Sequence, residues 1–200
     1  MDNTPLGYTM IEYMAILMAS TIWSLNPALV SRFREHIKPI TYNAVRAIIA
    51  VIFLLPLAFL NGLGLRGAPL LLIVIAILTA ILGPGIGDAA YTKAIQLIGG
   101  SLAVIISYTY MFVAQGIAVT LLGEELSIPL FIGAIIAFIG VVIATAENPR
   151  RHLKLGGVVY ALITSIFWGI GASLLKIILN YIDVLTVTIV RLVAIAVLFL

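Results

Sequence analysis

Cysteine and charge are the two things that this chain has least of. It contains no cysteine, which excludes disulfide bonds and metal ions held by thiolates. Charged residues make up only 10% of its 200 positions, against about 25% in soluble domains. Hydrophobic residues make up 63%, and the mean hydropathy is +1.24. The composition therefore predicts a membrane protein and excludes an ordinary soluble domain.

The scarcity of charge also limits the partners. A net charge of +3, scattered along the chain, is too small to predict a nucleic-acid surface. No residues are spaced like a metal site and no motif indicates a cofactor, so we predict neither. The lipid bilayer is the first expected partner, and the sequence leaves the oligomeric state open.

Apolar stretches of about 17–23 residues recur along the chain, and about 20 residues rising 1.5 Å each cross the hydrocarbon of a bilayer. We therefore expect an all-α, multi-pass protein of the cell membrane. The third stretch contains Gly83-Pro84-Gly85-Ile86-Gly87-Asp88, so this helix either breaks inside the membrane or continues, distorted, to about Ile98. The seven predicted helices cover residues 13–30, 42–60, 68–98, 101–122, 128–146, 156–178 and 184 onward.

Part of the chain occurs twice. A shift of 145 residues, without a gap, places Trp23 on Trp168 and Arg46 on Arg191. The chain has only two tryptophans and few charges, so chance is a poor explanation and a tandem duplication is the better one. The same shift aligns six further identical pairs, which begin at Leu17, Ser20, Leu29, Ile37, Thr41 and Val45.

The length of the repeat predicts its orientation. It holds five spans, and an odd number makes the second copy enter the membrane from the opposite side. Inverted repeats are typical of secondary transporters, which bind substrate near the midplane between the repeats. We expect a first repeat at residues 13–146, a linker at 147–154, and the first two helices of a second repeat at 155–200. With two of five helices in the second copy, we expect the chain to be truncated and transport to be incomplete in this form.

Several short motifs carry a resemblance to a known family. They are Trp23, Thr41 to Arg46, Ala94 before Gly99-Gly100, and Leu122-Gly123-Glu124 before Gly133 to Gly140. In this order the chain resembles the EamA-type repeat of the drug/metabolite transporter superfamily. The resemblance implies a ten-helix carrier for small metabolites such as amino acids, sugars or nucleotide precursors, working by alternating access. The family usually has a proline near the position of Tyr110, which this chain lacks, so the resemblance does not predict a bend there.

Membrane orientation is predicted in two opposite ways. Loops on the side of the N-terminus carry two basic residues, Arg66 and Lys176, whereas the opposite loops carry seven. The positive-inside rule then places the N-terminus outside. The family resemblance instead implies cytoplasmic termini, and the sequence leaves both open.

Arg46 and Arg191 are the first candidates for a substrate or gating contact. An ionisable residue inside a span costs about 2.5–3.5 kcal/mol or more, so it indicates function by default. The alternatives are that Arg46 reaches back to the membrane interface with its long side chain, or that it forms a structural pair. Recurrence in both repeats shows common ancestry and does not separate these interpretations.

Aromatic and polar residues in the spans are further candidates. Trp23 and Trp168 lie in mid-helix, away from the interfaces where tryptophan is usually enriched, so they line a cavity or pack between helices. Tyr108, Tyr110 and Gln115 form a polar stripe on the fourth helix that could face the same cavity.

Asp88 has three interpretations. The first is functional: it could bind a coupling proton or a cationic group of the substrate. The second is structural: it could cap a helix or pair with Lys93. It also ends a G-x-G-D sequence, Gly85 to Asp88, which resembles that of intramembrane aspartyl proteases. Those enzymes need a second intramembrane carboxylate, and the other aspartates, Asp2 and Asp183, occupy a terminus and a loop. We therefore predict no enzyme activity and keep the protease as a remote alternative; a non-transporting membrane subunit or scaffold is the nearer one.

We predict that Arg46→Lys in the carrier loses most transport while the protein still inserts and folds, if Arg46 contacts substrate or a gating partner. A guanidinium offers two parallel hydrogen bonds to a carboxylate, and lysine does not reproduce them. Uptake into liposomes at matched expression measures this. Wild-type flux would mean that Arg46 only reaches the interface, where lysine serves equally well.

Overall fold

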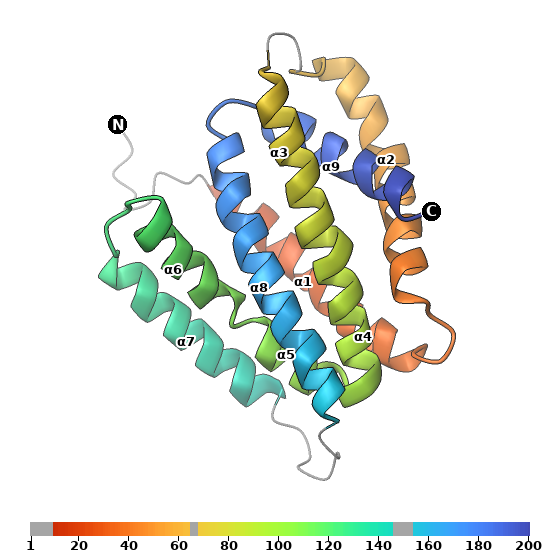
Figure 1. The fold of residues 1–200 in the computed structure, drawn as a ribbon, viewed down its shortest axis with the longest axis vertical. Helices are drawn as coiled ribbons and strands as arrows, with labels where there is room; N and C mark the ends of the chain where they lie inside the picture. Colours follow the sequence, from red (N-terminus) through yellow and green to blue (C-terminus); the bar gives the residue numbers. More distant parts are fainter. Residues whose placement is uncertain (1–9, 65–67, 146–153) are drawn as a thin grey trace.

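The computed structural model describes residues 10–64, 68–145 and 154–200, and these residues form helices joined by loops, with no strand (Figure 1). Within these ranges the helices group into seven apolar segments, as the sequence predicts. Of the predicted linker at residues 147–154, only Lys154 lies within the described residues. The elements are α1 (Met10–Arg32), α2 (Pro39–Asn61), α3 (Leu70–Ala80), the π-helix η1 (Ile81–Gly87), α4 (Asp88–Ile98), α5 (Gly100–Ser107), α6 (Tyr110–Leu121), α7 (Ile128–Thr145), α8 (Leu155–Ile178) and α9 (Val184–Leu198).

Five of these segments are long and apolar enough to span a bilayer: α1, α2, the continuous run from Leu70 to Ile98, the run from Gly100 to Leu121, and α8. The apolar part of α7, Ile128–Gly140, and α9 are shorter. Outward-facing leucine, isoleucine and phenylalanine are common on most of them, as expected where lipid replaces water, but on the run from Gly100 to Leu121 the exposed large apolar residues are Val119 and Leu121. The predicted all-α, polytopic architecture is confirmed.

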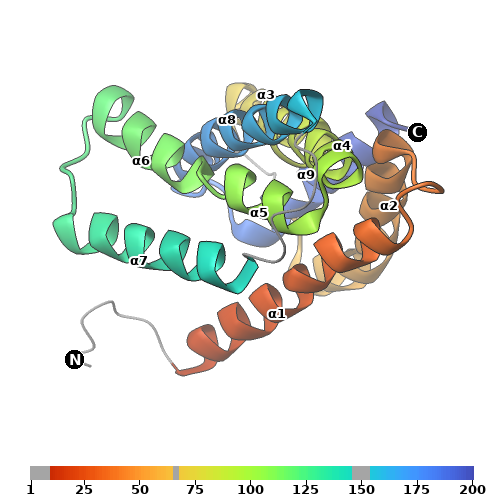
Figure 2. The ribbon, with the colours of Figure 1, turned by 90° about the horizontal axis from the view of Figure 1, so that it is seen from below.

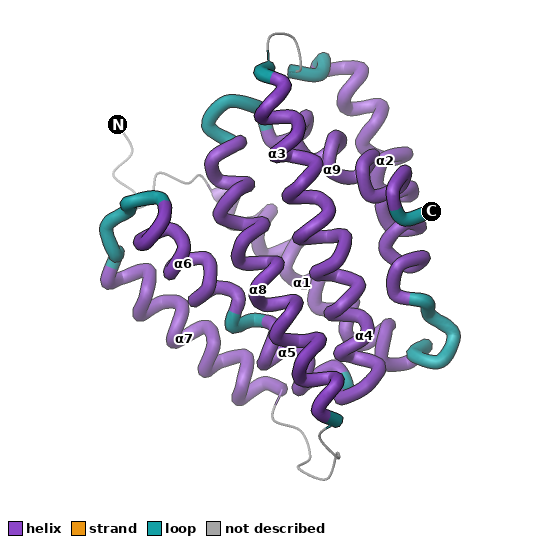
Figure 3. Tube along the Cα trace, in the orientation of Figure 1, coloured by secondary structure: helices purple, strands orange, loops and turns teal. Residues whose placement is uncertain are grey.

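The third span continues through its glycine-rich segment and does not break (Figure 3). Pro84 has no N–H and its ring conflicts with the preceding turn, so the backbone widens into η1. Two carbonyls of this segment find another donor: Asn43 on α2 donates its side-chain N–H to Pro84 O at 3.1 Å and to Gly85 O at 3.2 Å. A polar side chain on a neighbouring helix thus makes the irregular backbone tolerable inside the membrane.

The fourth span bends although it lacks the family's proline. Tyr108 and Thr109 form a turn between α5 and α6, drawn as a loop in Figure 3. The Thr109 hydroxyl satisfies Ile106 O at 2.6 Å and forms a hydrogen bond with the Ser165 hydroxyl at 2.8 Å. The predicted span over 101–122 is present, and the bend that the sequence left open is there, stabilised by local hydroxyl bonding in place of a proline.

Helix α8 lies at the centre of the molecule and packs against α3, η1, α4, α5 and α6. Its polar side chains face these neighbours: Thr164 donates to Gly87 O at 3.2 Å, and Ser173 lies 3.4 Å from Ala114 O. In Figure 1, α1 runs downward and α8 runs upward, so the helices that carry Trp23 and Trp168 point in opposite directions.

Helix α7 lies at the periphery, next to α5 and α6 (Figure 2). Gly133 and Gly140 are spaced to lie on one face of α7, a pattern typical of close contact between membrane helices. No described atom lies within 4 Å of the position that a Cβ would take at either glycine. These glycines therefore make no close contact within the described residues.

Close contact occurs instead at the start of α8. A Cβ on Gly157 would collide with Ile98 and would lie 3.0 Å from Leu97 Cβ. At the adjacent Gly156 the nearest such atom is 4.0 Å away. We predict that Gly157→Ala lowers stability by about 1–3 kcal/mol through overpacking, whereas Gly156→Ala leaves it unchanged or slightly raises it.

Thermal unfolding of the purified protein in detergent measures both variants. A fall of roughly 2–4 °C for each kcal/mol is expected for a chain of this size. Equal midpoints for the two variants would contradict the close contact between α8 and the end of α4.

Candidate functional site

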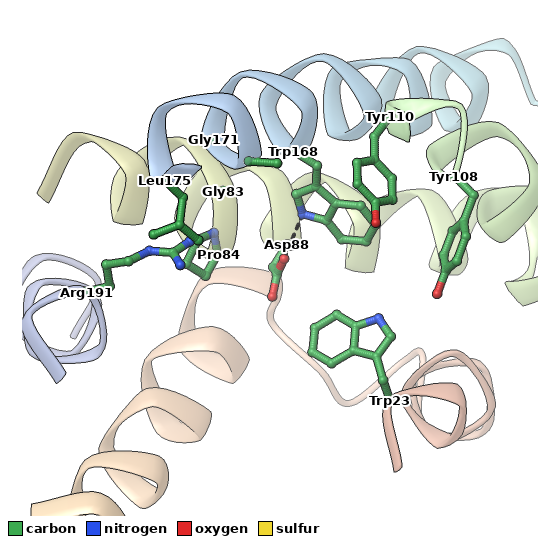
Figure 4. A pocket seen from close by; sticks show the side chains of 11 residues that line it. Trp23, Gly83, Pro84, Asp88, Tyr108, Tyr110, Trp168, Gly171, Leu175 and Arg191 are labelled. Carbon is green, nitrogen blue, oxygen red and sulfur yellow. Dashed lines mark hydrogen bonds between the residues drawn. The ribbon is translucent and has the colours of Figure 1, made fainter. Parts of the chain in front are cut away.

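A pocket of about 340 Å³ lies between α1, η1, α8 and α9, next to the bend in the fourth span (Figure 4). Six of the eight residues singled out in the sequence line it, which brings together groups that are up to 168 positions apart in the chain. The lining residues are Trp23, Gly83, Pro84, Asp88, Tyr108, Tyr110, Trp168, Gly171, Ala172, Leu175 and Arg191.

The carboxylate of Asp88 is held on both oxygens. Trp168 Nε1 donates to Asp88 Oδ1 at 2.8 Å, and Arg46 Nη1 lies 3.4 Å from Asp88 Oδ2. The side chain of Asp88 is 10% exposed and that of Arg46 is 33% exposed. Of the interpretations considered for Arg46, the structure shows the ion pair, and the partner of Asp88 is Arg46 rather than Lys93. The widened η1 directly precedes Asp88 and sets the direction of its side chain.

Two aromatic rings lie against the Arg46 guanidinium. Its Cζ lies 5.1 Å from the ring centre of Trp23 and 5.3 Å from that of Tyr42, within the range of a cation–π attraction. Tyr42 in turn donates to Asn26 Oδ1 at 2.6 Å. Sequence analysis missed Tyr42 and Asn26, although a buried asparagine in an apolar span is a signal that could have found them.

Trp168 is the centre of the aromatic wall. Its ring centre lies 5.0 Å from that of Tyr91, 5.6 Å from Tyr110, 6.4 Å from Tyr108 and 6.5 Å from Trp23. All four pairs are tilted or edge-on, the arrangements that aromatic rings prefer. Tyr91 was missed because it looks like an ordinary core residue.

A glycine makes room for the Trp168 indole. A Cβ on Gly87 would lie 2.7 Å from Trp168 Cδ1 and 3.0 Å from Trp168 Nε1. Any larger residue would therefore displace the indole from Asp88. Glycine is therefore required at position 87 to make room for the indole, in addition to the effect of the glycine-rich segment on the backbone.

The surroundings of Arg191 differ from those of Arg46. It lines the pocket, and its Nε is buried with no hydrogen-bond partner among the described residues. Within the same residues no acidic side chain forms an ion pair with it. Its Nη2 lies 3.3 Å from where a Cβ on Gly83 would be, so Gly83 leaves space for the guanidinium. Figure 4 shows Arg191 at one end of the pocket, with Asp88 between it and the tyrosines.

Gln115 and Asp183 lie elsewhere. Gln115 is absent from the lining, and its buried Oε1 has no partner among the described residues, so its assignment to the cavity stays a prediction. Asp183 accepts a hydrogen bond from Thr186 N at 2.9 Å and caps α9. Hydrogen bonds from Thr186, through its hydroxyl and its backbone N–H, lower the pKa of Asp183. Asp183 is therefore a helix cap and not the second carboxylate that a protease would need beside Asp88.

These features define a polytopic membrane protein whose helices enclose a pocket lined by charged and aromatic side chains. The EamA-like transporter family matches residues 10–146. The match covers more than half of the chain, which therefore belongs to this family. The resemblance seen in the sequence is confirmed, and the family points to a transporter rather than an enzyme.

A relative described as an "Uncharacterized transporter" from Archaeoglobus fulgidus is 26% identical over 183 residues. The aligned part covers 92% of this chain and 65% of the relative, so the chain spans about two thirds of that protein's length. No solved structure matches the chain.

We predict strong energetic coupling between Arg46 and Asp88. Removing one partner of a buried ion pair costs about 3–5 kcal/mol, and partial exposure of Arg46 places the expected cost at the lower end. Arg46→Gln should therefore destabilise the protein, and Arg46→Gln with Asp88→Asn should restore part of the loss. Thermal unfolding of the two single variants and the double variant gives the coupling energy.

The chain offers a matched control. Lys176 Nζ lies 2.6 Å from Glu124 Oε2, with side chains that are 61% and 37% exposed. Coupling in this exposed pair should stay below about 1 kcal/mol. Similar coupling in both pairs would contradict a structural role of the Arg46–Asp88 pair.

Proposed function

We propose that this chain forms at least part of a secondary carrier in the cell membrane, which moves a small metabolite such as an amino acid by alternating access. The observation that carries the proposal is the pocket. Its walls come from the family-matched segment and from α8 and α9, which follow that segment. A site shared by two repeats is the place where carriers of this kind bind substrate.

The duplicated tryptophans support an inverted pair of repeats around this pocket. Trp23 and Trp168 occupy equivalent positions, and their ring centres are 6.5 Å apart. Two residues related by a two-fold axis come close together only where they lie near that axis. The opposite directions of α1 and α8 agree with an axis in the membrane plane that passes beside the pocket. Residues 13–146 and 155–200 are then the two units that move against each other.

The residues then have distinct proposed roles. Arg191, Trp23, Trp168, Tyr108 and Tyr110 face the substrate. Arg46 supports the pocket through Asp88 and acts as a gating element when that pair opens. A non-transporting subunit stays the alternative class, but no contact within the described residues favours it over a carrier.

The cysteine-free sequence allows a direct test. Ala172 is exposed and lines the pocket, whereas Ile166 on the same helix is 50% exposed and lies outside the lining. We predict that a cysteine at Ala172→Cys reacts with a membrane-impermeant maleimide from either side of the membrane. A mixture of the twenty amino acids should slow that reaction by occupying the pocket.

The control is Ile166→Cys, which should react slowly and without any effect of the mixture, because it faces lipid. Labelling of Ala172→Cys from one side only would contradict alternating access. Labelling that no amino acid, sugar or nucleoside slows would contradict the pocket as the substrate site.

A further inference from the structure

We infer that Arg191 is the anion-binding residue of the pocket, and that the pocket's ligand is a small organic monocarboxylate with a flat, apolar body. The inference rests on the proposed function, because it assigns the chemistry of the ligand to the same pocket. It starts from the difference between the two duplicated arginines. The Arg46 guanidinium already pairs with the Asp88 carboxylate, whereas the Arg191 guanidinium has no carboxylate partner among the described residues.

The charge balance of the pocket selects an anion. Three charged side chains line it or contact its lining: Arg46, Asp88 and Arg191. Arg46 and Asp88 form an ion pair, and Trp168 occupies the other oxygen of Asp88. One positive charge therefore remains. An uncompensated guanidinium in a poorly solvated site gains most from a single carboxylate, which it binds with two parallel hydrogen bonds.

Asp88 is poorly placed to bind a cation in this arrangement. Both of its oxygens have donors, and the Arg46 side chain is fixed against Trp23 and Tyr42. An ammonium group would have to share Asp88 with Arg46, whose positive charge lies 3.4 Å from Asp88 Oδ2 and repels a second cation. The pair therefore leaves the pocket with a preference for an anion over a cation.

The aromatic residues that line the pocket determine the shape of ligand that fits it. Trp23, Trp168, Tyr108 and Tyr110 present ring faces and edges on the far side of Asp88 from Arg191 (Figure 4). Flat apolar groups pack favourably between such rings. A volume of about 340 Å³ is at the low end for ligand pockets, which run from about 300 to 1,000 Å³. A ring joined to one carboxylate fits both the volume and the distribution of polar groups.

Intrinsic fluorescence tests this assignment, because the only two tryptophans of the chain both line the pocket. The probes are phenylacetate, 2-phenylethanol, 2-phenylethylammonium and L-phenylalanine, which share a ring and differ in the charge of the head group. The purified protein in detergent is titrated with each. We expect saturable quenching by phenylacetate, with an affinity at least tenfold higher than for the neutral alcohol or the cation.

Variants assign the effect to one residue. Arg191→Gln should lower the affinity for phenylacetate by about tenfold to a hundredfold and leave the affinity for 2-phenylethanol unchanged. Arg191→Lys keeps the positive charge but cannot form two parallel hydrogen bonds to a carboxylate, so its affinity for phenylacetate should be intermediate. Arg34→Gln removes the same group from an exposed site and should change nothing. Unchanged binding of 2-phenylethanol shows that the Arg191 variants are folded; if Arg191→Gln fails to fold, Arg191→Lys decides.

Three results would overturn the inference. They are equal binding of phenylacetate and 2-phenylethanol, a wild-type response to phenylacetate in both Arg191 variants, and tighter binding of the cation or of L-phenylalanine than of phenylacetate. The last result would mean that Asp88 is free to take an ammonium group. No response to any probe, while amino acids still protect Ala172→Cys, would overturn the anion assignment and leave the proposed function in place.

Discussion

A single buried carboxylate organises the middle of this protein. Asp88 lies in a medium that solvates charge poorly, so its ionised form is stable only if other residues supply donors. Trp168 on α8 and Arg46 on α2 supply them, and the Arg46 guanidinium in turn lies against Trp23 on α1. One carboxylate therefore links four helices that are far apart in the chain. The position of the pocket beside Asp88 follows from the same contacts.

The irregular backbone around Asp88 is a condition for these contacts. Pro84 widens the helix into η1, and Asn43 satisfies the carbonyls that the widening leaves exposed. Gly87 lets the indole of Trp168 approach to within hydrogen-bond distance of Asp88. A regular helix with an alanine at position 87 would turn Asp88 to another direction and close the space for the ring.

Much of the fold was open to prediction from the sequence, because the bilayer fixes the length of apolar helices and leaves few alternatives. The spans follow from hydropathy, and six residues of the pocket follow from the rarity of tryptophan, charge and polar side chains within the spans. The pairing of Arg46 with Asp88 does not, since the spacing of two residues on different helices says nothing about their distance. The bend at Tyr108 and Thr109 stayed open for a related reason: the hydroxyl that stabilises it bonds to Ser165 on α8, a distant segment.

Arg46 and Arg191 occupy matching positions in the sequence, yet their surroundings differ. Asp88 accepts hydrogen bonds from Trp168 and Arg46. Within the described residues no ion pair joins Asp88 or another acidic side chain to Arg191, although Asp88 and Arg191 line the same pocket. A guanidinium inside a span costs about 2.5–3.5 kcal/mol or more when it lacks a partner. A ligand with a carboxylate pairs with this guanidinium and removes the cost of burying it unpaired. The cost returns when the ligand leaves, so the empty and occupied pockets differ in free energy. A ligand shifts a conformational equilibrium only by its difference in affinity for the two conformations. In the proposed carrier, Arg191 therefore couples binding to movement to the extent that the two conformations hold its guanidinium differently against the ligand.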